Sequence, residues 1–192
     1  NQMFIDACVA SGMKPNSDVN GAEQEGVGRM QTNQRGGMRD STARAYLEPA
    51  RARANLTVMT GAFAQRLRLA NGRAIGVEIV RNGTVLNLDA KKEVIVSTGS
   101  LSTPKLLMLS GIGPREELEK HGIACQIDLP GVGANLQEHP GVIVDFEMTI
   151  PTLNRIAHSP IRYLTAALQY AFSRRGPASS PIAHVVGFFK TD

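Results

Sequence analysis

The chain has 192 residues, of which 42% are hydrophobic and 20% charged, and its formal net charge is +4. This composition supplies enough apolar side chains for a core and predicts a soluble globular protein, formed by one domain or by parts of two. No apolar run approaches the ~20 residues of a membrane-spanning helix, and the basic residues form no stripe with interleaved aromatic residues, which argues against a membrane span and against nucleic-acid binding.

The two cysteines, Cys8 and Cys125, are far apart in the sequence and match no metal-ligand or redox spacing. A disulfide framework is therefore not expected. A reducing, cytoplasmic compartment is expected instead. The four histidines lack a neighbouring His or Cys at metal-ligand spacing, so no metal site is expected either. Because the chain begins without Met and inside a predicted helix, we expect it to be a piece of a longer protein.

The first fifty residues are predicted to form two short helices separated by a loop. The first helix ends at Gly12, and four of its residues share one apolar face: Met3, Phe4, Ala7 and Cys8. Residues 14–40 are rich in Gly, Asn and Gln without periodicity, which predicts an extended loop. Ser41 is a suitable N-cap for a helix to about Glu48, which Pro49 would limit.

Residues 63–88 are predicted to form three antiparallel strands in a meander. Apolar side chains alternate along each strand, and two dipeptides, Asn71-Gly72 and Asn82-Gly83, favour two-residue hairpin turns because both accept a positive φ. The next apolar run, Val94 to Val96, is uninterrupted, which predicts a strand buried on both faces of a parallel sheet.

Two helices are expected after that strand. In the first, Ser102 or Thr103 caps the N-terminus, Pro104 takes the first helical position, and Gly111 follows the end. The second begins at Pro114 and closes at Gly122. Its charges suit the helix dipole, with acidic residues first and basic residues last: Glu116, Glu117, Lys120 and His121. His121 is therefore read as a cation at a helix end.

The last fifty residues are predicted to add a strand, a helix and a strand. Apolar and polar side chains alternate along residues 142–149, which is typical of an antiparallel strand with one solvent-exposed face. A helix follows from Ser159-Pro160 to Gly176-Pro177, with an apolar face at helical spacing: Ile161, Leu164, Leu168, Ala171 and Phe172. The final strand is expected at Ile182 to Phe189.

Nucleotide-binding potential is concentrated where the Val94–Val96 strand ends in Thr98, Gly99 and Ser100. Small residues and backbone amides between a strand and a helix commonly contact nucleotides, although many such turns simply favour Gly and Ser. Gly131-Val132-Gly133 has no third glycine at the fingerprint spacing and is read as a tight turn. His139 precedes a proline and either faces a ligand or bonds to backbone within a turn.

Residues 99–113 closely resemble the second signature of the glucose-methanol-choline (GMC) oxidoreductase family. Four elements of that signature occur in order: Gly99-Ser100, Thr103-Pro104, Leu106-Leu107 and Ser110-Gly111-Ile112-Gly113. Segments on both sides also resemble the family, among them "EGVGRMQTNQRGGMRDS", "NLTVMT" and "DLPGVGANLQEHP". The resemblance covers essentially the whole chain and is closest in character to choline dehydrogenase-like alcohol dehydrogenases.

The resemblance implies a mixed α/β (α+β) fold. It would comprise part of an FAD-binding domain of the glutathione-reductase type with a β-meander, and part of an antiparallel-sheet substrate domain. Residues 1–40 would be a loop-rich contribution to the substrate domain, residues 41–140 would belong to the FAD-binding domain, and residues 141–192 to the substrate domain.

The resemblance also implies the FAD-contacting residues and the reaction. The contacts would involve Ala64, Thr98, Gly99, Ser100, Asn135 and His139. The parent enzyme would oxidise a small alcohol by hydride transfer to flavin. The family's N-terminal glycine fingerprint and its C-terminal His-containing segment are not within these residues, so we assign no catalytic residue here. We expect this chain to need the rest of the parent chain and not to retain FAD tightly by itself.

Two alternatives remain at this point. A flavoprotein of the disulfide reductase type, with two dinucleotide-binding domains, shares the meander and the Ser-Thr-Gly-Ser strand end, but the expected cysteine pair is lacking. A non-catalytic binding module is the other alternative.

Overall fold

The computed structural model describes residues 2–149, 152–181 and 183–190. Helices and strands are mixed along the chain, which confirms the predicted fold class, and the residues divide into two compact units. One unit comprises Asn1–Leu56 and Asp145–Asp192, and the other comprises Thr57–Val144. This division describes packing alone, so the predicted domains 1–40, 41–140 and 141–192 stay predictions.

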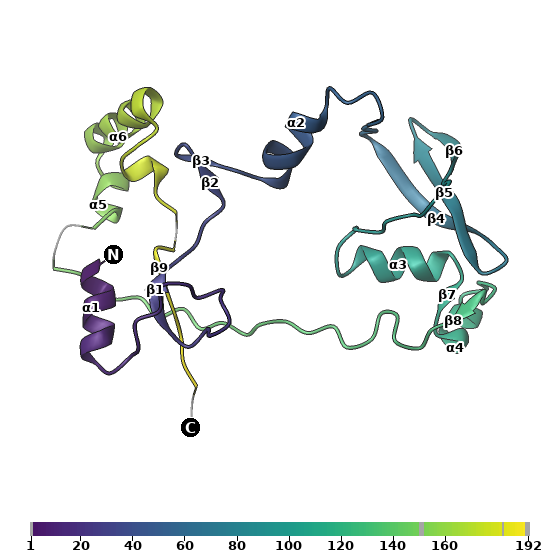
Figure 1. Cartoon of the computed structure of the whole chain (residues 1–192), viewed down its shortest axis with the longest axis horizontal. Helices are drawn as coiled ribbons and strands as arrows, with labels where there is room; N and C mark the ends of the chain where they lie inside the picture. The colour runs from purple at the N-terminus through teal and green to yellow at the C-terminus, as the bar shows by residue number, and fades with distance from the viewer. Residues whose placement is uncertain (1, 150–151, 182, 191–192) are drawn as a thin grey trace. The chain divides into compact units, whose positions relative to one another are not determined.

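The Thr57–Val144 unit is built on the predicted meander (Figure 1). Strands β4 (Ala62–Ala70), β5 (Arg73–Arg81) and β6 (Thr84–Asp89) are antiparallel in the order β4-β5-β6. Asn71 and Asn82 adopt φ values of 52° and 51° at the two turns. Since only Gly, Asn and Asp enter this region cheaply, the turn residues set the meander, and its prediction is confirmed.

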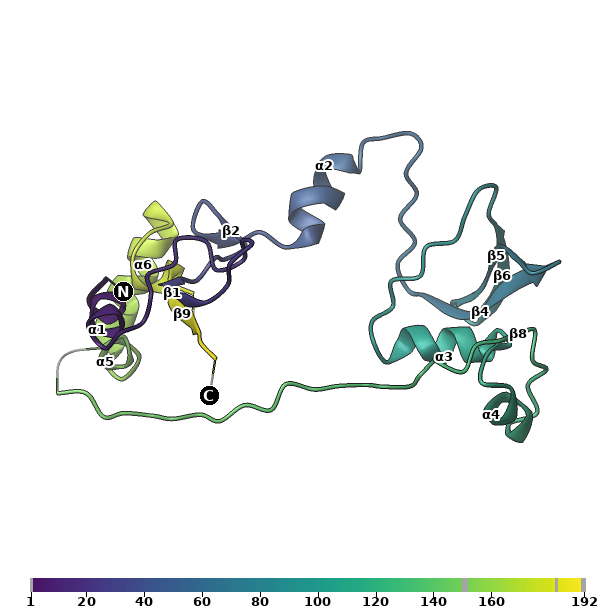
Figure 2. The ribbon, with the colours of Figure 1, turned by 60° about the horizontal axis from the view of Figure 1, so that its bottom comes forward.

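Helix α3 (Ser102–Leu109) lies alongside β4 and closes the core of this unit (Figure 2). The core is formed by Leu67 of β4, Leu106 of α3 and Ile112, each no more than 8% exposed. Burying one such side chain contributes about 1.5–3 kcal/mol. The meander and helix α3 therefore stabilise each other.

The segment that follows α3 forms a short parallel β-pair and one helix. Strand β7 (Ile112–Gly113) pairs in parallel with β8 (Ile127–Asp128), and helix α4 (Arg115–Lys120) connects them. Leu118 of α4 is only 2% exposed. Pro114, the acidic first turn and Gly122 at φ 69° confirm the predicted helix signals.

The prediction of a doubly buried strand at Val94–Val96 is wrong for the described chain. Val94 and Val96 pack half-buried against the core, but Ile95 is 79% exposed, and the segment pairs with no strand in the described ranges. A strand is buried on both faces only when neighbouring elements cover them. The apolar run Val94–Val96 indicates a segment that needs neighbouring elements on both faces, and the described chain does not place such elements on both faces.

The predicted cap of α3 is also wrong. Leu101 takes the N-cap position, no side chain caps the helix, and Pro104 is the third helical residue instead of the first. The hydroxyl of Thr103 contacts the hydroxyl of Thr98 at 3.0 Å instead, so its side chain serves the preceding turn.

The other unit contains a β-pairing that the loop prediction for residues 14–40 missed. Strand β1 (Gly26–Arg29) pairs antiparallel with β9 (Val185–Phe188), and β2 (Gln34–Arg35) with β3 (Met38–Arg39). Val27 is 2% exposed. Because the partner of β1 is far away in sequence, no local pattern in residues 14–40 could indicate the pairing. The predicted final strand is confirmed over β9, and Ile182 lies outside the described residues.

The N-terminal helix α1 (Gln2–Ala10) forms as predicted but with a different buried face. Ile5 is buried, while Met3, Phe4 and Ala7 are exposed and Cys8 is half-buried. Its predicted stop, Gly12, has φ 101°.

The second predicted helix is the π-type turn η1 (Ala43–Leu47) continued by α2 (Glu48–Ala50). Thr42 takes the N-cap position of η1 in place of the predicted Ser41, whose hydroxyl accepts the N–H of Arg44 at 3.4 Å. The expected stop at Pro49 is one residue too early, because the helical stretch includes Pro49 and ends at Ala50.

The remaining helices are α5 (Asn154–Ala157), α6 (Pro160–Ser173) and the 3₁₀ turn η2 (Pro177–Ser179). Helix α6 is confirmed and ends at Arg174 with φ 55°. Its buried residue is Ala166, however, and the predicted apolar face is exposed, Phe172 at 87%. Residues 142–149 form no strand and are exposed, so that prediction is wrong as well.

Candidate functional site

The turn Thr98–Ser100 leaves its backbone open to a partner. Gly99 has φ +91°, and a Cβ placed on it would meet nothing within 4 Å. Its carbonyl accepts the N–H of Thr103 at 2.9 Å, and the hydroxyls of Thr98 and Thr103 lie 3.0 Å apart. These two contacts hold the turn against the start of α3 and leave the Gly99 Cα side uncovered.

A cavity of about 1070 Å³ extends from this turn along α3. Its lining includes Ser100 and Lys105 on one part of the chain, His121 after α4, and the turn residues Val132 to Gln137. Gly133 has φ +79°, and a Cβ there would lie 2.7 Å from Cε of Met108. The turn predicted at Gly131-Val132-Gly133 is thus confirmed, and the absence of a side chain lets it approach α3.

Some of the residues that the resemblance assigned to FAD come together here. Ser100 and Asn135 line the same cavity although 35 residues separate them, and Asn135 has φ 57°. Thr98 and Gly99 directly precede Ser100 in the chain but are not among the lining residues.

Ala64 and His139, like Thr98 and Gly99, are not among the lining residues of this cavity. Ala64 of β4 is half-buried against the hydrophobic core. His139 is exposed, and its backbone N–H donates to Oε1 of its neighbour Glu138 at 3.0 Å.

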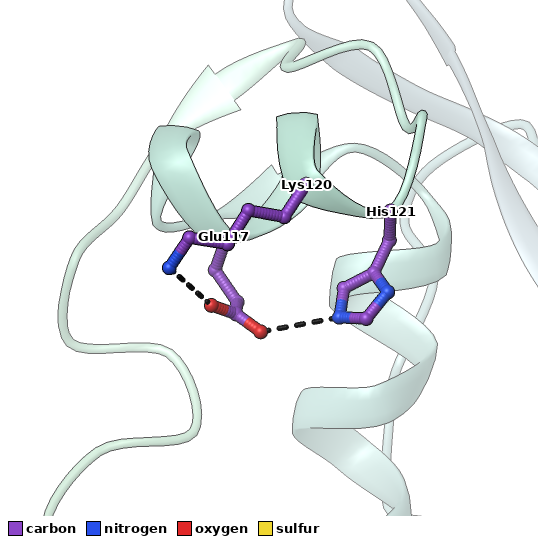
Figure 3. Close-up of polar contacts among 3 residues, drawn as sticks. All are labelled: Glu117, Lys120 and His121. Atoms are coloured by element: carbon purple, nitrogen blue, oxygen red, sulfur yellow. Dashed lines mark hydrogen bonds and ion pairs between the residues drawn. The ribbon is translucent and has the colours of Figure 1, made fainter.

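Two residues of basic types line this cavity and were not assigned to binding from the sequence. Lys105 and His121 both line it. Nε2 of His121 lies 3.2 Å from Oε1 of Glu117, whose other oxygen accepts from Nζ of Lys120 at 3.3 Å (Figure 3). These two partners, Lys120 first, lower the pKa of the Glu117 carboxyl below its ordinary value. The predicted place of His121 at the end of α4 is confirmed, with Glu117 as its partner, and its role as a cation stays a prediction.

The helical spacing of residues 101–108 could have indicated that Lys105 lies on the face of α3 that lines the cavity. Leu101, Lys105 and Met108 follow one another at i, i+4 and i+7, on a different face from the buried Leu106. His121 lies on a separate segment, and no sequence periodicity relates it to α3.

The other glycines of the signature contact protein and not open space. A Cβ on Gly111, at φ +78°, would lie 2.6 Å from the carbonyl oxygen of Ala124. One on Gly113 would lie 3.1 Å from Cγ of Met108. Gly111 and Gly113 thus permit close packing between α3 and the β7–β8 pair, whereas Gly99 alone of the three faces open space.

Within residues 2–149, 152–181 and 183–190, no group of three or more His, Cys, Asp or Glu side chains could hold a metal ion. No helix in those same ranges has the length and apolarity needed to cross a bilayer.

Comparison with curated proteins finds oxygen-dependent choline dehydrogenases. The one from Rhizobium johnstonii is 51% identical over 138 residues, which cover 72% of this chain and 25% of the relative. The one from Staphylococcus aureus is 40% identical over 191 residues, 100% of this chain and 33% of the relative. The chain thus spans 25% to 33% of the length of these relatives.

Solved structures with similar folds are FAD-dependent oxidoreductases and oxidases. An FAD-dependent oxidoreductase from Chaetomium thermophilum superposes with a TM-score of 0.86 at 27% identity, over 97% of this chain and 34% of that one. Formate oxidase from Aspergillus oryzae gives a TM-score of 0.81 at 28% identity, over 97% and 33%.

The family model described as GMC oxidoreductase matches residues 1–141, most of the chain. This match confirms the resemblance carried by residues 99–113, and the curated relatives agree with it. The chain belongs to the GMC oxidoreductase family.

Proposed function

We propose that this chain is a central part of an FAD-dependent enzyme that oxidises an alcohol to a carbonyl compound. The observation that carries the proposal is the open backbone of Gly99 between two hydroxyl-bearing residues, one of which, Ser100, lines a cavity together with Asn135. Family membership supports the same chemistry, since relatives bear the names choline dehydrogenase and FAD-dependent oxidoreductase.

The residues present fit a flavin nucleotide. Backbone without a side chain permits close approach, and exposed Thr98 and Ser100 offer hydroxyl donors and acceptors. Lys105 adds positive charge to the cavity that Ser100 lines, and His121 adds a ring nitrogen, which suits a phosphate-bearing ligand. We assign Thr98, Gly99, Ser100 and Asn135 to cofactor binding.

Ala64 and His139 stay predictions for cofactor binding. The two differ in exposure, since Ala64 is half-buried and His139 is exposed. Ala64 packs its side chain on the core, so only its backbone would contribute. The exposed His139 side chain would require the cofactor to extend beyond the cavity described here.

The flavin supplies the hydride acceptor when bound, while the hydroxyl proton of the alcohol leaves to a base. This chain binds and orients the nucleotide and excludes water from one side of it. No residue of the chain is assigned as that base.

The partners of this chain are a small-molecule alcohol and the remaining part of an enzyme of the relatives' length. Its matched region is 25% to 33% of each relative, so we expect the isolated chain to hold FAD weakly and to lack turnover. A cytoplasmic location is part of the proposal, supported by the unpaired thiols of Cys8 and Cys125.

The experiment is to replace the matched third of the Staphylococcus aureus relative with this chain and to measure bound flavin by its absorbance. Anaerobic addition of an alcohol substrate should then bleach the flavin band as hydride is transferred. The isolated 192-residue chain, purified in parallel, is expected to show little flavin.

Two outcomes would contradict the proposal. One is a folded chimera, with the circular dichroism of the parent relative, that binds no flavin. The other is a chimera that binds flavin but is never reduced by any alcohol that reduces the parent, which would favour a non-catalytic binding module.

A further inference from the structure

The thioether of Met108 lies between two glycines on different elements. A Cβ placed on Gly113 of β7 would lie 3.1 Å from Cγ of Met108, and one placed on Gly133 would lie 2.7 Å from its Cε. The sulfur joins those two carbon atoms, so it lies between β7 and the turn at residues 131–134. Glycine at both positions leaves room for the thioether and for little else.

Met108 also borders the flavin-binding candidate. It is half-buried on α3 and lines the cavity of about 1070 Å³ together with Ser100 and Asn135. A small solute that enters this cavity therefore reaches the side chain of Met108. The core residue Leu106, two positions earlier on the same helix, is only 5% exposed and is not among the lining residues.

The turn that packs on Met108 leads directly into Asn135. Two backbone hydrogen bonds, donated by Val132 and Ala134 at 3.1 Å and 3.3 Å, form the turn. Asn135 follows with a left-handed φ of 57°, so the direction of its side chain depends on where the turn holds its backbone. A change in the packing of Met108 would therefore reach a residue assigned to cofactor binding.

The sulfur of methionine is oxidised by peroxides. In that step the sulfur takes one oxygen atom from hydrogen peroxide. An S–O bond forms and the O–O bond breaks, the thioether is oxidised to a sulfoxide, and the peroxide is reduced to water. A sulfoxide is larger and polar, so it favours leaving the narrow slot between Gly113 and Gly133 for the open cavity.

We propose that Met108 is a peroxide-sensitive residue whose oxidation to the sulfoxide releases the 131–134 turn and weakens flavin binding. This rests on the proposed function, since the cavity beside Met108 is the one assigned to the flavin nucleotide. Met108 acts on the cofactor through the position of Asn135, so it is a positioning residue. Reduction of the sulfoxide to the thioether restores the turn.

The test uses the chimera with the Staphylococcus aureus relative, in which the remaining part of an enzyme surrounds the chain. The chimera is treated with hydrogen peroxide, and sulfoxides are located by peptide mass spectrometry. Fluorescence titration measures FAD affinity, and hydrogen exchange measures the protection of residues 131–137. Treatment should oxidise Met108, weaken FAD binding at least about tenfold and speed the exchange of residues 131–137.

Three substitutions separate Met108 from the other oxidisable side chains of the chimera. Met108→Leu keeps an apolar side chain of similar volume without sulfur, so FAD affinity should stay within about threefold of the parent chimera before treatment and after it. Met108→Gln has nearly the same length and a polar end, as the sulfoxide has, and should weaken FAD binding without peroxide. Met59→Leu is the matched control, since Met59 is also half-buried in the same unit but does not line the cavity. It should leave the effect of peroxide unchanged.

Reduction identifies the modified group. Methionine sulfoxide reductases A and B together reduce both sulfoxide epimers, so with dithiothreitol as their reductant they should restore FAD affinity to the oxidised chimera. Dithiothreitol without the enzymes reduces disulfides and sulfenic acids but leaves sulfoxides, so it should restore none of the affinity. Recovery with dithiothreitol alone would assign the effect to thiols and would contradict a role for Met108.

Other results would also overturn the proposal. One is oxidation of Met148, which is 55% exposed, without oxidation of Met108. Another is an equal loss of FAD affinity in Met108→Leu, and a third is a sulfoxide at Met108 with unchanged exchange of residues 131–137. A chimera that binds no flavin before treatment contradicts the proposed function instead. The exchange of residues 131–137 then still decides whether oxidation of Met108 releases the turn.

Discussion

The hydroxyl of Ser110 ties the end of helix α3 to the outer edge of strand β4. Its oxygen accepts the N–H of Leu67 at 2.7 Å and donates to the carbonyl of Leu106 at 2.6 Å. Ser110 and both partners are buried. A serine of the family signature therefore has a structural role here, because it accepts a β4 amide on the edge of β4 opposite β5, where the described chain places no further strand.

Replacing this serine should destabilise the fold. Ser110→Ala leaves the Leu67 N–H buried without a partner, which costs about 1–3 kcal/mol. Urea unfolding followed by circular dichroism should show the loss, and the Leu67 amide should exchange its hydrogen faster. Ser102→Ala, at an exposed position of the same helix, is the control and should change neither measurement. An unchanged Leu67 exchange rate would mean that this hydrogen bond does not form.

Two glycines with similar backbone angles should differ in their tolerance of a side chain. Gly111 (φ +78°) and Gly122 (φ +69°) both have left-handed conformations, but only at Gly111 would a Cβ contact neighbouring atoms, at 2.6 Å and 2.7 Å. We expect Gly122→Ala to cost about 1 kcal/mol from backbone strain alone and Gly111→Ala about 3 kcal/mol. Urea unfolding measures both, and equal losses would contradict the close approach at Gly111.

A side chain at Gly99 should weaken FAD binding without contacting other residues of the chain. Gly99 and Gly72 both have positive φ and open space at the Cβ position, so alanine at either should carry a similar cost in unfolding free energy. In the chimera described above, Gly99→Ala should weaken FAD binding at least about tenfold, and Gly72→Ala should leave it unchanged. Fluorescence titration of FAD measures the two dissociation constants. Unchanged FAD affinity in Gly99→Ala would remove this turn from the nucleotide site.

The ion pairs of Glu117 should make α4 sensitive to acid. Lys120 and His121 lower the pKa of Glu117 in the folded chain, so the folded state binds fewer protons than the unfolded state at low pH. The stabilisation is present above the pKa that Glu117 has in the unfolded chain, and it is lost as the pH falls through the lowered pKa of the folded chain. Glu117→Gln should remove this part of the pH dependence.

Carbon-13 NMR titration of the Glu117 carboxyl group measures that pKa directly. The effect should shrink in high salt because the group is exposed. Glu116→Gln, which removes a charge from the same turn, serves as the control for thermal unfolding at several pH values. A Glu117 carboxyl that titrates at its ordinary pKa would contradict the contacts in Figure 3.

Local chemistry accounts for the elements that were predicted correctly. Asn71-Gly72 and Asn82-Gly83 accept positive φ, and this alone is enough to join three alternating strands into a meander. Pro114 and Gly122 likewise begin and end α4 through their own backbone preferences. Such preferences act within a few residues, so they can be read before any fold is known.

Burial was predicted poorly wherever it depends on a distant partner. Ile95, Val142 and Phe172 were expected in covered faces, yet each is exposed. Val27 was expected in a loop, yet it is buried in a strand whose partner, Gly187, is 160 residues away. An apolar pattern indicates that a face requires cover, and only the tertiary arrangement provides or withholds it.

By itself, the sequence determined the meander, helices α3, α4 and α6, the family, and the turn at Thr98–Ser100, because turn residues, helix signals and a contiguous signature all act over short distances. Only the tertiary structure decided that Ser110 secures β4, that Asn135 joins Ser100 at one cavity, and that Met108 lies against Gly133. Each of these relationships joins positions that are separated along the chain, and side chains become neighbours there only after the backbone between them has folded.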